Sequence, residues 1–142
     1  MRFAYPFVTE ADEDGRVLLH FPDVPGAQTD GADAKEAVAG AEDVLLAALG
    51  GHVEARRPVP PPSPARGRPV VVLPPLAAAK LALHAAMLED GVSNSELGRR
   101  LGVTESIIRR LLDLDHRSHI GNVGAALAAL GREIEVQVRR AA

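Results

Sequence analysis

The sequence contains no cysteine and no tryptophan, and aromatic residues make up only 3% of its 142 residues. The absence of cysteine excludes a disulfide-linked scaffold, a thiolate metal site and a cysteine nucleophile. The aromatic residues all lie near the N-terminus: Phe3, Tyr5, Phe7 and Phe21. The rest of the core must therefore be built from aliphatic side chains.

Long apolar segments are also lacking. No uncharged apolar run approaches the roughly 20 residues that a membrane-spanning helix needs. The N-terminus has no signal-peptide pattern, because Pro6, Glu10 and Asp12 interrupt it. We therefore expect a cytoplasmic protein.

Charge is distributed unevenly along the chain. Residues 1–57 contain 5 Lys+Arg and 11 Asp+Glu, whereas residues 66–142 contain 11 and 8. An acidic half joined to a mildly basic half suggests two modules with different partners.

Proline is concentrated between the two halves, in the run Arg57-Pro58-Val59-Pro60-Pro61-Pro62-Ser63-Pro64. Proline fixes φ and removes a backbone donor, so this run cannot form a helix or an inner strand. We predict a semi-rigid connector over residues 57–69. The chain then divides into a domain at 1–75, which includes the connector, and a domain at 76–142.

The pattern of the first domain predicts a small sheet with one helix. Two alternating runs, Phe3–Phe7 and Val17–Phe21, flank Asp14-Gly15, which is typical of a hairpin turn. A short third strand is expected over 27–29 and a helix over 33–49, with Asp33 and Glu36 at its start. The run Val70–Leu73 predicts a last strand. The expected order is β-β-β-α-β.

The pattern of the second domain predicts an all-helical fold. Helical spacing predicts one helix from Leu76 to Gly91, and Ser93, Thr104 and Ser118 are expected to cap three more. The tail alternates strictly and predicts a strand with no sheet to join in its own domain. Pairing with the same strand of a second copy would satisfy it. The residues expected at that dimer contact are Ile134, Val136 and Val138.

Residues 95–111 have a helix-turn-helix pattern. Gly98 is small where two helices must approach, and Gly102 can adopt positive φ at the turn. The second helix would then present its first turn to the major groove of DNA. The expected DNA-binding residues are Ser95, Arg99, Arg100, Thr104, Glu105, Ser106, Arg109, Arg110 and Arg117. The alternative is a helical bundle whose exposed arginines are simply solvated.

Catalytic and metal-binding patterns are weak. The carboxylates at 12–14 are explained by a solvated hairpin tip, and Asp113, Asp115, His116 and His119 by a loop beside a basic surface. His20 is expected at the surface of its strand. No nucleophile elbow, phosphate loop or zinc-protease motif occurs. We expect no catalytic residue, no metal site, no cofactor and no enzyme activity.

The first domain resembles the HicB antitoxin family. The resemblance rests on Asp14-Gly15, on the run from Leu19 to Gly26 that ends Phe-Pro-Asp-Val-Pro-Gly, on Thr29-Asp30-Gly31, and on Glu36-Ala37. The C-terminal helix-turn-helix with a last strand looks like the DNA-binding form of the same family. Ala27 departs from the pattern, in which cysteine often follows the glycine, and the connector is unusually rich in proline.

The resemblance implies a partial ribonuclease-H-like N-terminal domain without catalytic function. It implies a type II antitoxin that binds and blocks HicA, a small basic toxin that cleaves mRNA, and that represses its own operon as a homodimer or tetramer. The bend at Phe21–Gly26 is expected to be structural. The groups with which the chain would contact the toxin are expected to be acidic: Asp23, Asp30, Glu42 and Asp43.

Two alternatives remain open on the sequence. One is a stand-alone transcriptional regulator whose N-terminal domain senses a small ligand. The other is a nuclease that retains activity in the N-terminal domain, although its strands carry almost none of the carboxylates that such an activity needs.

Overall fold

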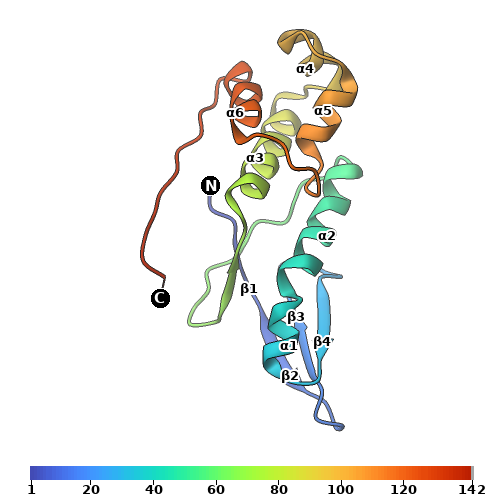
Figure 1. Cartoon of the computed structure of the whole chain (residues 1–142), viewed down its shortest axis with the longest axis vertical. Helices are drawn as coiled ribbons and strands as arrows, with labels where there is room; N and C mark the ends of the chain where they lie inside the picture. The colour runs from blue at the N-terminus through green and yellow to red at the C-terminus, as the bar shows by residue number, and fades with distance from the viewer. Residues whose placement is uncertain (142) are drawn as a thin grey trace.

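The computed structural model describes residues 1–141 and shows an elongated molecule, with an α+β half at one end and helices at the other (Figure 1). The strands are β1 (Ala4–Pro6), β2 (Val8–Ala11), β3 (Val17–His20), β4 (Gln28–Gly31) and β5 (Val70–Val72). The helices are α1 (Ala34–Ala39), α2 (Ala41–Glu54), α3 (Pro75–Asp90), α4 (Asn94–Leu101), α5 (Glu105–Leu112) and α6 (Ile120–Ala129). No helix in the described range is long and apolar enough to cross a membrane.

The turn and the second strand of the predicted hairpin are confirmed, but its first strand is β2 and not the run Phe3–Phe7. β2 and β3 pair antiparallel, and β4 adds to the other side of β3. At the turn, the Asp12 carboxylate accepts the backbone N–H of Asp14 and of Arg16, both at 2.9 Å. Gly15 has φ +83°, which glycine adopts without strain. The predicted run Phe3–Phe7 contains β1 instead, which lies in a second sheet, and Phe7 separates β1 from β2.

The strand predicted at Val70–Leu73 is also confirmed, since β5 pairs antiparallel with β1. Backbone hydrogen bonds from Phe7 to Pro69 and from Leu73 to Phe3, both 3.0 Å, extend the pairing at its two ends. The chain therefore leaves the N-terminal half through the connector and returns to it before α3 begins.

The prediction of one helix over residues 33–49 is wrong at two points: Gly40 divides it into α1 and α2, and α2 continues through Gly50 and Gly51 to Glu54. Glycine weakens a helix interior, and Gly40 is at once the C-cap of α1 and the N-cap of α2. The predicted start holds, since the Asp33 carboxylate accepts the Glu36 N–H at 2.8 Å. The two helices cover one face of the β2–β3–β4 sheet.

The connector is bound to the N-terminal half at two points. The buried Tyr5 hydroxyl donates to the Pro60 carbonyl at 2.7 Å. The Asp23 carboxylate accepts the Ser63 N–H and hydroxyl at 2.8 and 2.9 Å. Burial, followed by the nearby Asp23 charge, raises the pKa of Tyr5 to about 12. The proline-rich segment therefore runs along the sheet domain as a fixed strap.

One prediction for the C-terminal half needs correction. Ser118 does not cap α6, which begins after His119 without a side-chain cap; the Ser118 hydroxyl donates to the Arg110 carbonyl instead. Residues 133–138 are extended, and no strand among residues 1–141 lies beside them, so their pairing with a second copy stays a prediction. Figure 1 shows this tail running back from α6 along the outside of the molecule.

The core is continuous through both halves. It joins apolar residues of the sheet to Leu45 and Leu49 of α2, to Leu81 and Leu83 of α3, and to the helices beyond. Burial of such side chains from water is the main source of stability here. The shared core fixes α3, and with it the α4–α5 pair, on the N-terminal half.

Candidate functional site

The α4–α5 pair has the geometry of a helix-turn-helix. The Ser93 hydroxyl caps α4 by accepting the Glu96 N–H at 3.1 Å, and the Thr104 hydroxyl caps α5. Gly102 ends α4 with φ +68°. A Cβ on Gly98 would lie 2.8 Å from the Val103 carbonyl oxygen, so only glycine fits this close approach without movement. These features agree with the predicted turn.

The structure brings the predicted DNA-binding residues to one end of the molecule, opposite the β2–β3 hairpin (Figure 1). All of them are exposed: Ser95, Arg99 and Arg100 on α4, Thr104, Glu105, Ser106, Arg109 and Arg110 at α5, and Arg117 on the following loop. The apolar side of α5 is turned inward, with Ile108, Leu111 and Leu112 buried. The pair therefore presents a polar, cationic surface on a rigid apolar base.

Acidic side chains on the same helices hold several of these arginines. Glu96 pairs with Arg99 and, at 3.2 Å, with Arg100. Glu105 pairs with Arg109 at 3.3 Å. The arginine side chains remain between 43% and 77% exposed, so these ion pairs are weak and screened by salt. A polyanion can therefore compete for the guanidinium groups at little cost.

Lys80 is a fully buried cation beneath α5, and sequence analysis assigned it no function. Its Nζ donates to the carbonyl oxygens of Arg110, Asp113 and His116 at 2.9, 2.6 and 2.8 Å. Because carbonyls only accept, these bonds use all three protons of an ammonium group. Burial lowers the pKa of Lys80, and the Asp113 carboxylate opposes that shift. Lys80 thus holds the C-terminal end of α5 and the loop that carries Arg117.

The chemistry around Lys80 is structural. Ser118 Oγ lies 2.9 Å from Lys80 Nζ and 3.1 Å from His116 Nδ1, a set that resembles an activated serine. A general base must be unprotonated, and the three carbonyls favour the protonated amine. Within residues 1–141, no group of three or more His, Asp or Glu could hold a metal ion.

A second buried polar group joins the connector to α3. His84 Nε2 lies 2.8 Å from the Arg57 carbonyl, which can only accept, so Nε2 carries the proton. Burial is the main cause that lowers the pKa of His84, and the charges of Arg56 and His52 add to it, while the bond to Arg57 opposes it. Beside it, the Arg56 guanidinium donates to Asn94 Oδ1 at 3.1 Å. The end of α2 is therefore linked to both α3 and α4.

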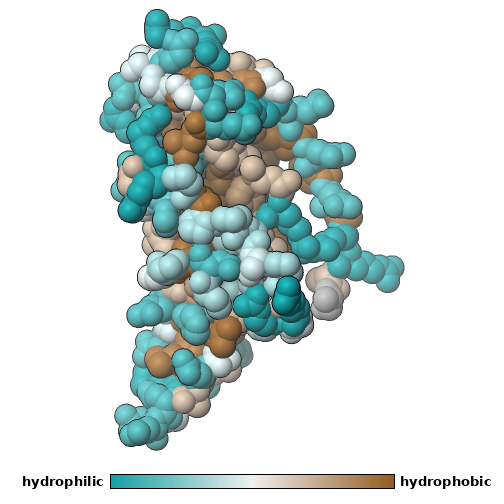
Figure 2. Space-filling view, turned by 180° about the vertical axis from the view of Figure 1, so that it is seen from behind, coloured by the Kyte–Doolittle hydropathy of each residue, from teal (hydrophilic) through white to brown (hydrophobic). Residues whose placement is uncertain are grey.

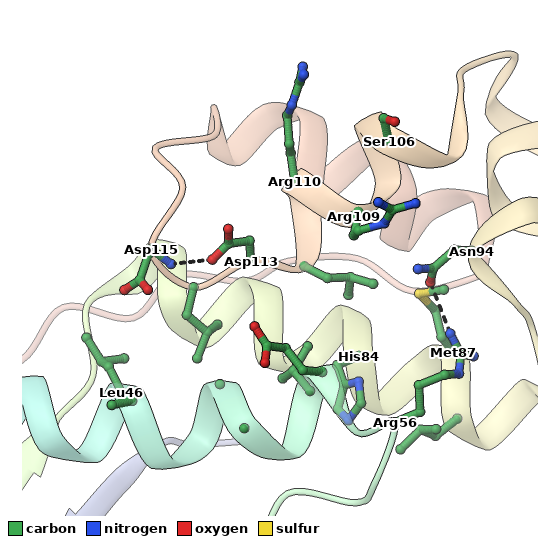
Figure 3. Close-up of a pocket in the computed structure, with 18 residues that line it drawn as sticks. Leu46, Arg56, His84, Met87, Asn94, Ser106, Arg109, Arg110, Asp113 and Asp115 are labelled. Carbon is green, nitrogen blue, oxygen red and sulfur yellow. Dashed lines mark hydrogen bonds between the residues drawn. The ribbon is translucent and has the colours of Figure 1, made fainter.

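A cleft of about 840 Å³ lies between α2, α3 and α5 (Figure 3). Its lining includes Leu46 of α2, Met87 of α3 and the predicted DNA-binding residues Ser106, Arg109 and Arg110. In Figure 3, the Arg110 side chain points away from α2, and Ser106 lies on the outer side of α5. The cleft therefore lies behind the outer surface of α5, which leaves that surface open.

The four acidic candidates for toxin contact are not brought together. Asp23 is half-buried and bonded to Ser63, which gives it a structural role in holding the connector. Asp30 is exposed on β4 and pairs with Arg16 at 2.9 Å. Glu42 and Asp43 are exposed in the first turn of α2. Helices α1 and α2 lie on one face of the sheet, so these residues belong to different surfaces.

The three tail residues predicted to pair with a second copy are exposed to different degrees. Ile134 is 36% exposed and lies near Gly124 of α6, whereas Val136 and Val138 are 67% and 90% exposed. Large aliphatic side chains in an extended and unpaired segment leave both apolar surface and backbone groups to water.

Comparison with known proteins identifies the family. Residues 4–82 match the family described as "HicB_like antitoxin of bacterial toxin-antitoxin system". The chain belongs to the HicB antitoxin family. "Antitoxin HicB 2" of Photorhabdus laumondii is 40% identical over 132 residues, covering 93% of this chain and 94% of the relative. "Antitoxin HicB" of Escherichia coli K12 is 34% identical over 133 residues, with coverage of 93% and 96%.

HicB antitoxins are non-enzymatic, which agrees with the expectation from the sequence. The family match spans the sheet domain, the connector and the first part of α3, and the relatives align with both halves. Family membership therefore favours an antitoxin over the nuclease and over the stand-alone regulator.

Proposed function

We propose that this HicB-family chain neutralises a HicA-type toxin through its N-terminal half and represses its own operon through α4 and α5. The resemblance and the relatives named Antitoxin HicB support the first part. The second part rests on one observation: a capped helix pair that is closed at Gly98 and exposes arginines on its outer surface.

For DNA binding, α5 enters the major groove with Thr104, Glu105 and Ser106 in its first turn. Arg109 or Arg110 donates to a guanine edge. Ser95, Arg99, Arg100 and Arg117 contact the phosphate backbone and give salt-dependent affinity. Glu96 and Glu105 hold the arginines extended until phosphate replaces them.

A dimer completes the DNA-binding unit. The tail pairs through Ile134, Val136 and Val138 with the tail of a second copy, which satisfies the open backbone groups and buries the apolar side chains. Two recognition helices spaced by about 34 Å then read a near-palindromic operator.

For toxin binding, the N-terminal half offers acidic surface to a basic partner. Asp30, Glu42 and Asp43 are the exposed candidates, and Asp23 supports the strap instead of contacting the toxin. Occupation of the RNA-binding surface of the toxin by carboxylates would block its substrate.

The DNA-binding part is tested with Arg109→Ala, measured by gel shift on the DNA upstream of the chain's own gene and on random DNA. We expect a loss of about 1–3 kcal/mol on the specific site and less on random DNA, because a base contact is removed. Arg66→Ala, an exposed arginine of the connector, is the matched control and should bind as the parent does. Equal losses on both DNAs would make Arg109 a phosphate contact, and no binding by the parent chain would remove the repressor function.

A further inference from the structure

The β2–β3–β4 sheet has one bare face. Helices α1 and α2 cover the other face, where Leu19 is fully buried and where a Cβ on Gly31 would lie 2.5 Å from the Ala37 nitrogen. Side chains of a strand alternate between faces. The side chain of Leu18 lies on the opposite face of the sheet from that of Leu19 and is 41% exposed. A leucine in the middle strand of a sheet is therefore left open to water.

The strand register places two carboxylates beside this leucine. Glu10 of β2 and Asp30 of β4 are the direct partners of Leu18 on its two sides. Neighbouring strands lie about 4.8 Å apart, so the two acidic residues flank Leu18 in a row about 10 Å wide. The next row consists of Val8, His20 and Gln28. The bare face thus presents Leu18 between two carboxylates, next to a row with His20 at its centre.

The surface is hollowed at this row. A depression of about 360 Å³ is lined by Glu10, Leu18, His20, Gln28 and Asp30, among others. Figure 2 looks at the molecule from behind, and its lower end shows mainly hydrophilic surface with small hydrophobic patches. The depression has the shape to receive a protruding side chain.

The electrostatics of this face favour a cation. Arg16 pairs with Asp30, but both side chains are about half exposed, 48% and 50%. Such an exposed ion pair is weak, so a cation of a partner can replace Arg16 at small energetic cost. The hairpin tip beside it adds Asp12, Glu13 and Asp14. Glu10 forms no ion pair among the described residues, so its carboxylate can accept hydrogen bonds from a cationic side chain of a partner.

We propose that this bare face, formed by Glu10, Leu18 and Asp30, is the surface on which the antitoxin receives a basic side chain of its toxin. The inference rests on the antitoxin function proposed above. An arginine or lysine of the toxin lays its aliphatic stem over Leu18 and donates to Glu10 and Asp30, because long cationic side chains bury their stems and keep their charge at carboxylates. Of the exposed acidic candidates, this assigns the contact to Asp30 and not to Glu42 and Asp43.

A second copy of the chain fits this face poorly. Two copies joined face to face about a two-fold axis place acidic rows against acidic rows, and like charges across an interface are costly. The same charges suit a basic toxin. Charge complementarity therefore decides between the two occupants.

The test measures binding of the full-length chain to the HicA-type toxin of the same operon by calorimetry, with the toxin inactivated so that it can be purified. We expect Glu10→Gln with Asp30→Asn to weaken binding roughly tenfold or more, and Leu18→Arg to weaken it at least as much. Glu54→Lys with Asp115→Lys reverses two exposed charges far from this face and should bind within about threefold of the parent.

Thermal melting and DNA binding of each variant establish that it is folded. Toxin affinity of both face variants within threefold of the parent would overturn the proposal, and a loss with Glu42→Lys plus Asp43→Lys alone would move the contact to α2. Light scattering that shows smaller oligomers for Leu18→Arg with unchanged toxin binding would make the face a contact between copies. If the parent chain itself binds no toxin, the proposed antitoxin function fails instead.

Discussion

Lys80 shows how one buried residue can organise an exposed surface. Its ammonium group replaces water for three carbonyl oxygens at and beyond the end of α5, where the helix dipole is negative. Of the residues proposed to contact DNA, only Arg110 is bonded to it, and only through the backbone carbonyl. The positions of the side chains proposed to contact DNA nevertheless depend on Lys80, because its ammonium group is hydrogen-bonded to both the end of α5 and the loop that carries Arg117.

Lys80→Met keeps the aliphatic stem and removes the charge. We expect the free energy of unfolding to fall by about 3 kcal/mol, because buried carbonyls lose their donor. Specific DNA affinity should fall further than toxin affinity, since the surface proposed for the toxin lies at the other end of the molecule. The measurements are urea unfolding and gel shift.

The matched control is Lys35→Met on α1, where the lysine is exposed. It should leave unfolding within about 0.5 kcal/mol of the parent. Unchanged stability and DNA affinity of Lys80→Met would show that the carbonyls find water or another donor.

Alanine substitutions at Gly98 and Gly51 distinguish the effect of close packing from the effect of helix propensity. Gly98→Ala should cost roughly 1–3 kcal/mol of stability and weaken DNA binding, because the added methyl meets the Val103 carbonyl. Gly51→Ala on α2 meets nothing within 4 Å and should raise stability by up to about 1 kcal/mol. Thermal melts of the two variants check this. A stable, DNA-binding Gly98→Ala would mean that α4 and α5 can move apart without loss.

Single residues of the site were predictable to different extents. The exposed arginines follow from their spacing on an amphipathic helix, and Gly98 and Gly102 from the turn that they permit. Lys80 could have been suspected, since a lone lysine stands in an otherwise apolar helical stripe, but its partners come from residues 30 to 38 positions away. Asp23 was assigned to a partner surface because its bond to Ser63 is invisible in the sequence.

Among the elements, α2, the connector and α3 are joined by groups that titrate or carry charge. His84 donates to the Arg57 carbonyl, and Arg56 reaches the start of α4. These bonds link the end of the N-terminal half to the helices that carry the DNA surface.

The buried His84 predicts a pH dependence of this link. Its pKa lies below the ordinary value of 6.5, so the unfolded chain binds the proton more readily than the folded chain. Stability from this group is present above about pH 6.5 and is lost as the pH falls below it through the lowered pKa. We expect a smaller free energy of unfolding near pH 5 than near pH 7.5.

Urea unfolding of the parent and of His84→Gln checks this prediction. The difference in the free energy of unfolding between the two proteins should narrow as the pH is lowered, because only the parent is destabilised by protonation of residue 84. Parallel pH curves for the two proteins would assign the dependence to other groups.

Elements with local signals were predicted well. The Asp14-Gly15 turn, the strand at 70–72 and the caps at Asp33, Ser93 and Thr104 are all set by residues close in sequence. The break at Gly40 was missed because a single glycine in a helical pattern is often tolerated and does not by itself mark a boundary. The cap at Ser118 failed because its hydroxyl is drawn to Arg110 and Lys80.

For the whole molecule, the proposed pairing of the tail would set the number of copies in the assembly. Val136→Lys places a charge in the proposed strand pairing and should shift the chain from dimer to monomer in sedimentation analysis. Operator affinity should then fall by at least tenfold, because two half-sites are no longer bound together.

Arg139→Lys in the same tail keeps the charge and serves as the control. It should remain a dimer with full operator affinity. A dimeric Val136→Lys would place the contact between copies elsewhere on the molecule.

The position of β5 has a consequence for how such a chain can be recombined. Because this strand follows the strap and pairs with β1, a new C-terminal half can be joined only after Leu73 without removing that pairing from the N-terminal half. A junction in the proline-rich segment would leave β1 unpaired. The junction that keeps the N-terminal half intact therefore lies just before Pro75, downstream of the proline-rich segment that looks most like a linker.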